Sequence, residues 1–230
     1  YQCFRVDTAT EDSTVTFTDG KNVTHSIEYK SQIPLTPVLK AVWHTGMYVM
    51  AAWFLLTNLR FMLRLRRSRT PYPVEGCRYP VYLAEGLPSP CLFGLLHPAI
   101  YLTPAAAESP ETLRHVLAHE TTHARHGDPL WSLLRCVCLA VYWFDPLVWV
   151  AAVVSRRDCE LACDEGALQR PGEAERIPYG QTLLRLIPVA RRPESPMLSA
   201  TTMTAGKKEL KDRITRIAEN RRTVGVALLA

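Results

Sequence analysis

Two histidines and a glutamate lie within five consecutive residues, His119-Glu120-Thr121-Thr122-His123. Four residues of α-helix turn through about 400°, so both imidazoles would lie on one face, one turn apart. Two imidazoles at that spacing can bind a single Zn²⁺, and the carboxylate beside them can take a proton from water at the metal. The spacing therefore predicts a zinc site on a helix, with Glu120 as the general base.

A catalytic zinc site needs a third protein ligand and one open position. The segment after Asp145 contains Glu160 and Asp164, which are four residues apart and so share a helical face. One of these acids can bind zinc while the other accepts the N–H of a zinc-bound histidine. Cys159 and Cys163 have the same spacing, and as alternative soft ligands they would make a closed, structural site.

The glutamate of the motif favours the open, catalytic arrangement over the closed one. His115 and His126 each lie within one turn of the motif. We expect them to be surface histidines, with metal binding or donation to the transition state as alternatives. Tyr179 and His126 are the candidates for stabilising an oxyanion, and the residues that bind substrate are unknown.

Capping residues set the bounds of the helix that carries the motif. Ser109 is a candidate N-cap with Pro110 in the first turn, and Gly127 suits the helix end. Asp128 and Asp145, each followed by proline, predict two further helix starts. Residues 81–83 and 99–102 are expected to form short strands, and residues 15–23 a hairpin around Asp19-Gly20. An edge strand upstream of the zinc helix could accept an extended peptide.

Residues 41–59 contain no Asp, Glu, Lys or Arg. This stretch would be about 28 Å long as a helix, close to the roughly 30 Å hydrocarbon core of a bilayer. A basic cluster follows at once and marks the cytoplasmic end of a membrane span, which places residues 1–36 outside. Its members are Arg60, Arg64, Arg66, Arg67 and Arg69.

Charge and cysteine content narrow the class of protein. The chain has 230 residues, a net charge of +5 and 47% hydrophobic residues, and its basic residues gather at 60–69 and 207–222. Both clusters flank apolar stretches, which favours a membrane surface as the partner, and no nucleic-acid-binding motif is present. We therefore expect no direct binding to nucleic acid. Seven cysteines, an odd number in a chain of this length, argue against a disulfide framework.

A second apolar stretch, residues 131–154, is interrupted by Arg135 and Asp145. Each part is too short to cross a bilayer, so we expect two helices that meet at Asp145. They either pack on the zinc helix or enter the membrane face. In residues 207–222 a stripe of Leu210, Ile214 and Ile217 predicts an amphipathic juxtamembrane helix, with a solvated helix as the alternative.

Four segments resemble the BlaR/MecR family of integral-membrane zinc metallopeptidases, the β-lactam sensor–transducers and their relatives. They are residues 91–102, 117–128, 142–149 and 159–165, in the family's order and at similar spacing. Asp145 stands where the family usually has Asn, and Gly127 where a basic residue is common. The resemblance implies a zinc ion bound by His119, His123 and Glu160, with Glu120 as the base and Asp164 supporting a ligand.

The expected fold class is α+β: a mainly helical, membrane-associated, zincin-like (gluzincin-type) metallopeptidase domain with a small β-sheet, plus a transmembrane helix. We expect an extracytoplasmic loop (1–36), a transmembrane helix (37–60), and a cytoplasmic zinc peptidase domain (61–206). A basic juxtamembrane helix and the start of a further span would occupy 207–230.

The resemblance implies a multi-pass protein of the bacterial cell membrane that cuts itself or a transcriptional repressor in regulated signalling. One alternative is a transmembrane signal transducer whose zinc site is structural. The other is a membrane scaffold in which the motif occurs by chance.

Overall fold

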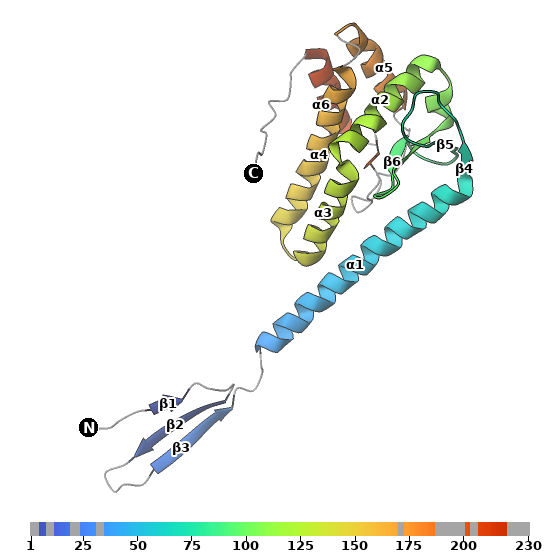
Figure 1. Ribbon diagram of the computed structural model, residues 1–230. Helices are drawn as coiled ribbons and strands as arrows, with labels where there is room; N and C mark the ends of the chain where they lie inside the picture. The colour runs from blue at the N-terminus through green and yellow to red at the C-terminus, as the bar shows by residue number, and fades with distance from the viewer. Residues whose placement is uncertain are drawn as a thin grey trace. The chain divides into compact units, whose positions relative to one another are not determined.

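The computed structural model describes residues 5–7, 12–18, 24–30, 35–169, 173–186, 201–202 and 207–219. The chain forms two compact units, Tyr1–Gly46 and Met47–Ala230. The first contains an antiparallel sheet of β1 (Arg5–Asp7), β2 (Asp12–Thr18) and β3 (Thr24–Lys30), in that order (Figure 1). Pairing of β2 with β3 confirms the predicted hairpin, whose turn residues Asp19 and Gly20 lie outside the described residues.

Helix α1 (Leu35–Ser68) contains the predicted transmembrane stretch. It is the one helix of the described residues that is long and apolar enough to cross a membrane. Only 6% of its most apolar window is buried, so it is not the core helix of a soluble domain. Near its C-terminal end Leu65 is buried against Ala84 and Tyr101 of the sheet of the second unit.

The sheet of the second unit is small and mixed. It consists of β4 (Arg69–Pro71), β5 (Val81–Ala84), β6 (Cys91–Phe93), β7 (Ala99–Leu102) and β8 (Thr201–Thr202), in the order β4-β5-β7-β6-β8. Strands β5 and β7 pair in parallel, and the other neighbours are antiparallel. The two predicted strands are confirmed, but both take inner positions. The other three are too short to show an alternating pattern in sequence.

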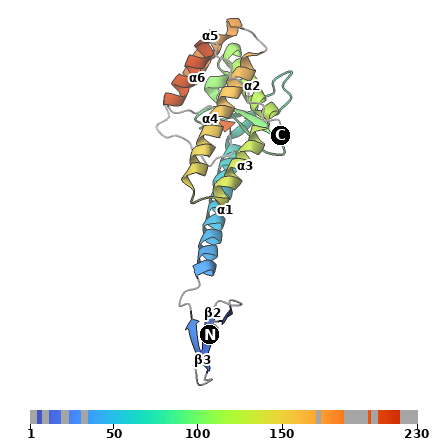
Figure 2. The same ribbon diagram turned by 90° about the vertical axis from the view of Figure 1, so that its left-hand side faces the viewer.

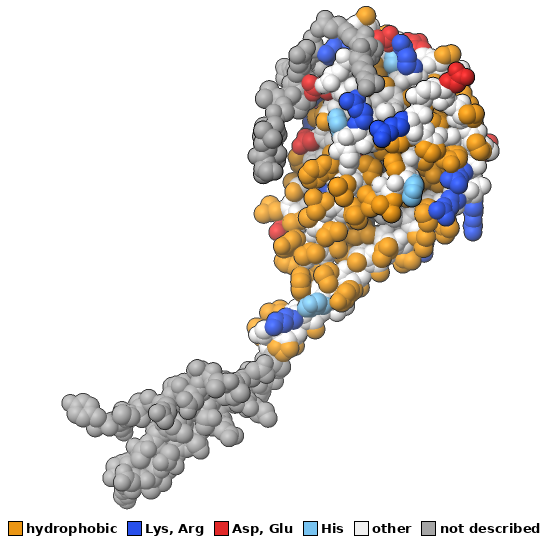
Figure 3. Space-filling view, in the orientation of Figure 1, with side chains coloured by type: hydrophobic (Ala, Val, Ile, Leu, Met, Phe, Trp, Pro, Cys, Tyr) orange, Lys and Arg blue, Asp and Glu red, His pale blue; other side chains and the backbone are white. Residues whose placement is uncertain are grey.

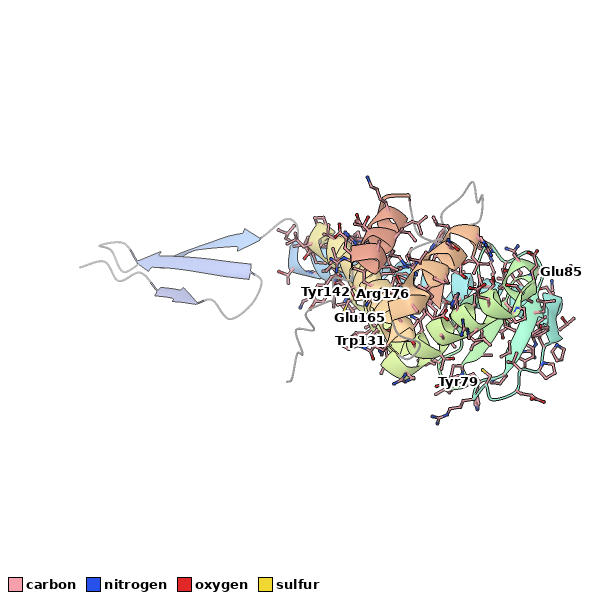
Figure 4. The ribbon with its side chains drawn as sticks, turned by 90° about the horizontal axis from the view of Figure 1, so that it is seen from above. Tyr79, Glu85, Trp131, Tyr142, Glu165 and Arg176 are labelled. Carbon is pink, nitrogen blue, oxygen red and sulfur yellow. The ribbon has the colours of Figure 1, made fainter. Side chains whose placement is uncertain are left out.

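Successive side chains of β7 point to opposite faces of the sheet, and both faces are buried at this strand. Ile100 and Leu102 join the core under the helices, whereas Ala99 and Tyr101 face the C-terminal part of α1. On the helical side lie η1 (Pro104–Ala107), α2 (Pro110–His126), α3 (Asp128–Val141), α4 (Pro146–Leu168), η2 (Glu173–Glu175), α5 (Arg176–Leu186) and α6 (Lys207–Glu219). Seen from above, Tyr79 and Glu85 lie on the sheet side of the domain, away from Trp131 on α3 and from Tyr142, which directly follows α3 (Figure 4).

The predicted helix boundaries are confirmed. The Ser109 hydroxyl accepts the Thr112 N–H at 3.1 Å, and the Asp145 carboxylate accepts the Leu147 N–H at 2.8 Å. Gly127 has φ 71°, a left-handed conformation that ends α2 and starts α3 without a connecting loop. Helices α3 and α4 meet at Asp145, as the sequence predicts.

Close packing of α2 on α4 depends on a glycine. A Cβ at Gly166 of α4 would come within 2.6 Å of the Thr122 methyl group of α2. Helix α6 packs against α4 and α5 (Figure 2). Its predicted apolar stripe faces the protein core, because Ile217 is buried there and Ile214 packs against the same cluster. The position of α6 beside a membrane stays a prediction.

Candidate metal centre

The side chains of His119, Glu120 and His123 on α2 are fully buried, and Glu160 meets them from α4. The two histidine Nε2 atoms are 3.0 Å apart. The Glu160 carboxylate places Oε2 at 3.6 Å from His119 Nε2 and Oε1 at 3.7 Å from His123 Nε2. The structure thus brings together the three side chains that the family resemblance implies as zinc ligands.

This cluster fits a zinc ion. Tetrahedral ligands at about 2.0–2.1 Å from one metal are separated from each other by roughly 3.3 Å, close to the spacing of these atoms. The ligand atoms of the three residues all lie within 4.8 Å of one another. Both carboxylate oxygens of Glu120, and Oε2 of Glu160, are buried without a hydrogen-bond partner. Buried carboxylate oxygens left in this way are costly, and a cation with its water would satisfy them.

Each histidine is held on the nitrogen that faces away from the cluster. His119 Nδ1 lies 2.8 Å from the Tyr179 hydroxyl and 3.2 Å from Asp164 Oδ1. His123 Nδ1 lies 2.5 Å from Asp128 Oδ2. A carboxylate on Nδ1 fixes the imidazole tautomer and leaves Nε2 free to bind a metal. Asp164 and Asp128 therefore orient one histidine each.

Arg213 closes the site from α6. Its side chain is 1% exposed, and its Nε and Nη2 atoms each donate to the Asp164 carboxylate at 2.6 Å. Its third nitrogen, Nη1, lies 3.2 Å from Glu160 Oε2. One guanidinium thus pairs with the candidate third ligand and with the acid that orients His119. Arg213 occupies the same face of α6 as Ile214 and Ile217. A basic residue on an otherwise apolar stripe was the sequence feature that could have indicated a buried, paired arginine.

These contacts decide the charge states in the buried cluster. Burial disfavours the charged forms of Glu160 and Asp164. Even so, His119, His123 and Arg213 hold the pKa of Glu160 at about 2, and Arg213 and His119 hold the pKa of Asp164 well below its ordinary value. Burial likewise opposes the charged form of His119, but Asp164 and Glu160 raise its pKa to about 9. Both acids are carboxylates, as metal binding and histidine orientation require.

Glu120 has the opposite environment. Burial raises its pKa, and the electrostatic effect of His123 and His119 only partly offsets that increase. The Leu92 backbone of β6 also lowers the pKa slightly, although no donor reaches hydrogen-bond geometry on either oxygen. A carboxylate with a raised pKa and free oxygens is suited to take up a proton.

The cysteines lie away from the two Nε2 atoms. Cys163 Sγ is 3.1 Å from Nδ1 of His123 and donates to Asp128 Oδ2 at 3.2 Å. Burial and the Asp128 carboxylate raise the pKa of this thiol far above its ordinary value, so it is a neutral donor and not a thiolate. The Cys159 thiol accepts from Arg135 Nη1 at 3.5 Å. Cys163, His123 and Asp128 also meet the spacing of a metal group, but the short His123–Asp128 contact is that of a hydrogen bond.

Two expectations for the flanking side chains need correction. His115 was expected at the surface and is buried, with its nitrogens 2.8 Å from Thr182 Oγ1 and 2.9 Å from Glu175 Oε2. Its position on α2 faces α5, which sequence spacing alone does not reveal. Tyr179, a candidate oxyanion donor, donates instead to Asp164 Oδ1 at 2.8 Å behind His119. His126 is exposed, as expected.

Comparison with known proteins agrees with this geometry. The model of the family described as BlaR1 peptidase M56 matches residues 5–217. The chain belongs to this peptidase family. It is 28% identical over 207 residues to the regulatory protein BlaR1 of Bacillus licheniformis, covering 84% of this chain and 34% of that protein. It is 23% identical over 137 residues to the methicillin resistance mecR1 proteins of Staphylococcus aureus and Staphylococcus epidermidis, covering 59% of this chain and 23% of each relative.

The chain therefore spans about a third of the BlaR1 relative and about a quarter of the mecR1 relatives. The resemblance seen in the sequence is confirmed at the level of the M56 family. A metallopeptidase family and the buried His/Glu cluster both point to a bound metal.

The zinc content of purified variants should distinguish the third ligand, Glu160, from the residues around it. We predict that Glu160→Ala loses zinc almost completely, and that Asp164→Ala weakens zinc affinity by about 10–100-fold because an orienting contact is lost. Cys159→Ser, Cys163→Ser and the control Glu165→Ala should bind zinc normally. Metal analysis of the purified variants measures this. Zinc loss in the cysteine variants, with retention in Glu160→Ala, would mean a structural His/Cys site instead.

The guanidinium of Arg213 should matter for metal binding although it does not touch the metal. We predict that Arg213→Gln weakens zinc affinity by about 10–100-fold, because Asp164 and Glu160 lose their shared partner. Competition with a zinc chelator measures the affinity, and far-UV circular dichroism checks that the variant folds. Lys211→Gln, exposed on the same helix, is the control. Equal affinity in a folded Arg213→Gln protein would refute the role.

Proposed function

We propose that the second unit is a zinc endopeptidase of zincin-like, gluzincin-type architecture. The observation that carries the proposal is the spacing of 3.0–3.7 Å between the metal-facing atoms of His119, His123 and Glu160, next to the buried, unpaired carboxylate of Glu120. Three ligands leave a fourth position open for water and substrate, which is the arrangement of catalytic zinc sites.

The residues of this chain supply binding, orientation and proton transfer. Zinc, when bound, contributes a Lewis acid that polarises the scissile carbonyl and makes water more acidic. Glu120 takes the proton of the attacking water at its carboxylate and then delivers it to the leaving amine. Asp164 and Asp128 keep the two histidines oriented through Nδ1. In this proposal one residue carries the proton, while the others bind the metal or keep its ligands oriented.

The side of β6 that pairs with β8 is the proposed place for the scissile segment. Strand β6 lies against α2, and the Leu92 backbone is the part of it that influences Glu120. Strand β8 pairs antiparallel with β6, with Leu92 opposite Thr201 and Cys91 opposite Thr202. This pairing supports the ability of that side of β6 to bind an extended segment, and a protein substrate would take the place of β8 there with the same kind of backbone hydrogen bonds.

We propose that the substrate is a protein in regulated signalling, either the chain itself or a transcriptional repressor. The name of the BlaR1 relative, a regulatory protein, supports this class of role. The alternative, a signal transducer with a purely structural zinc site, has less support. Such a site uses four protein ligands, whereas Cys163 lies on the Nδ1 side of His123 and Glu120 carries no hydrogen bond.

We further propose that α1 crosses the bacterial cell membrane in a multi-pass protein whose peptidase domain faces the cytoplasm. The support is the apolar, exposed character of α1 and the basic cluster at its C-terminal end. Residues 1–36 would then lie outside the cell.

The general base gives the sharpest test of catalysis. We predict that Glu120→Gln keeps zinc but lowers the rate of cleavage by about 10²–10⁴-fold, since a positioned base is lost while all ligands remain. The measurement is proteolysis of the chain or its partner by the purified protein in lipid, with zinc content determined on the same sample. Glu165→Gln is the matched control. Unchanged proteolysis in Glu120→Gln would overturn the peptidase assignment.

Orientation in the membrane can be tested with native cysteines. In intact cells an impermeant thiol reagent should modify Cys3 and leave Cys77 unmodified, because the basic cluster between them marks the cytoplasmic end of the span. After the cells are opened, Cys77 should react. The reverse pattern of labelling would invert the topology.

A further inference from the structure

The end of the domain where α3 and α4 meet carries a large uncovered apolar surface. On the face shown in Figure 3, hydrophobic side chains gather around this end, while most charged side chains lie toward the end that carries α5. We call this end the helical tip, residues 136–155. Its exposed members include Leu147, which is 74% exposed, together with Val137, Tyr142, Phe144, Val150, Val153 and Val154. Soluble surfaces rarely leave so many aliphatic side chains together in water.

The helical tip is continuous with the apolar part of α1. Phe54 of α1 is buried against Leu139 and Ala140 of α3. Met50, one turn earlier in α1, packs against the same cluster, as does Trp149 of α4. The exposed surface of α1 and that of the helical tip therefore form one apolar band within the second unit. Whatever solvent surrounds α1 at Met50 and Phe54 also surrounds the tip.

The lengths of the apolar parts of α1 and α4 indicate how far each would reach into a bilayer. From Arg60 back to Met50, α1 rises by roughly 15 Å, which is half of a hydrocarbon core of about 30 Å. From Leu147 to Arg156, α4 rises by about 14 Å before its first basic residue. The apolar length of the tip thus matches the depth of one leaflet, and the tip packs beside the charge-free part of α1 at Met50 and Phe54.

Two polar side chains of the tip are hydrogen-bonded within the protein, as hydrocarbon requires. Trp149 Nε1 donates to the Trp143 carbonyl at 3.0 Å. Asp145 is the one charged residue of the tip, and its carboxylate caps α4 through the Leu147 N–H. Arg135, just before the tip, points between the helices and donates to the Ser132 and Ser155 hydroxyls.

We propose that the α3–α4 tip is a re-entrant hairpin that enters the cytoplasmic leaflet beside α1, with lipid acyl chains as its partner. The proposal rests on α1 crossing the membrane. It also gives the substrate class of the site. Glu160 follows Arg156 by one helical turn of α4, about 6 Å, so the metal centre lies just outside the hydrocarbon. The scissile segments it reaches are those next to the inner membrane surface.

The test uses the unmodified chain in vesicles of phosphatidylethanolamine and phosphatidylglycerol, with a phospholipid that carries a photoactivatable diazirine near the end of one acyl chain. Trypsin separates the relevant regions: peptide 41–60 from α1, peptide 136–156 from the tip, and peptide 177–185 from α5. Mass spectrometry should find lipid adducts on the first two peptides and none on the third, although Ile177 and Leu184 are exposed there.

The possible results are distinct. Adducts on the α1 peptide without adducts on the tip would refute the hairpin and leave the span intact. Adducts on neither would refute the span as well. Labelling of the tip only by a diazirine in the headgroup would mean surface adsorption, and crosslinks between two copies at the tip without lipid adducts would mean a protein interface. Either result would overturn the proposal.

A matched pair of variants tests the same point. Val150 on α4 and Ile177 on α5 are both exposed β-branched residues of this unit. Val150→Asp should lower acyl-chain labelling of the tip peptide by about tenfold or more, because a charge in hydrocarbon is unfavourable. Ile177→Asp should not change it. Labelling of the α1 peptide, unchanged in both, shows that the protein is still inserted. Native labelling of the tip in Val150→Asp would contradict the hairpin.

Discussion

A charge removed from water must be paired, and in this protein one buried guanidinium pairs with two buried acids. Two nitrogens of Arg213 donate to the Asp164 carboxylate, and the third lies next to the Glu160 carboxylate. Removing one partner of such a buried pair costs about 3–5 kcal/mol, because the remaining charge is left without compensation. Helices α4 and α6 are therefore fixed relative to each other at the point where the candidate metal ligand and the orienting acid lie. Through Asp164, the same contact also reaches His119 Nδ1.

The features of the site that the sequence could predict are local ones. The spacing of His119 and His123 is set by one helical turn, and capping by Ser109 and Asp145 is decided within three residues. The contacts that the sequence did not reveal join distant segments. Tyr179 and Arg213 reach Asp164 from α5 and α6, and no spacing rule connects positions so far apart in the chain. Strand β8 likewise has no pattern of its own and is defined only by its partner β6.

Asp128 is intermediate between the local features and the contacts that join distant segments. It lies five residues after His123 and was recognised only as the start of a helix, since an acid before proline is a common N-terminal residue. The left-handed conformation of Gly127 turns the chain so that this carboxylate returns to His123 Nδ1. The sequence contained both residues, but their contact depends on the angle between α2 and α3. That angle is set by the packing of both helices on α4.

The apolar character of residues 131–154 was compatible with two arrangements, and the fold shows which of these side chains are covered by protein. Leu139 is buried against α1, whereas Leu147 and Val150 on α4 remain exposed. The same α4 that exposes these residues buries Glu160 and Asp164 in its C-terminal half. Helix α4 is continuous, so its two halves move together. The depth of its apolar half in a membrane would therefore fix the distance of Glu160 and Asp164 from the hydrocarbon. In the proposed hairpin, the apolar and charged halves of α4 would together hold the candidate metal centre at the membrane surface.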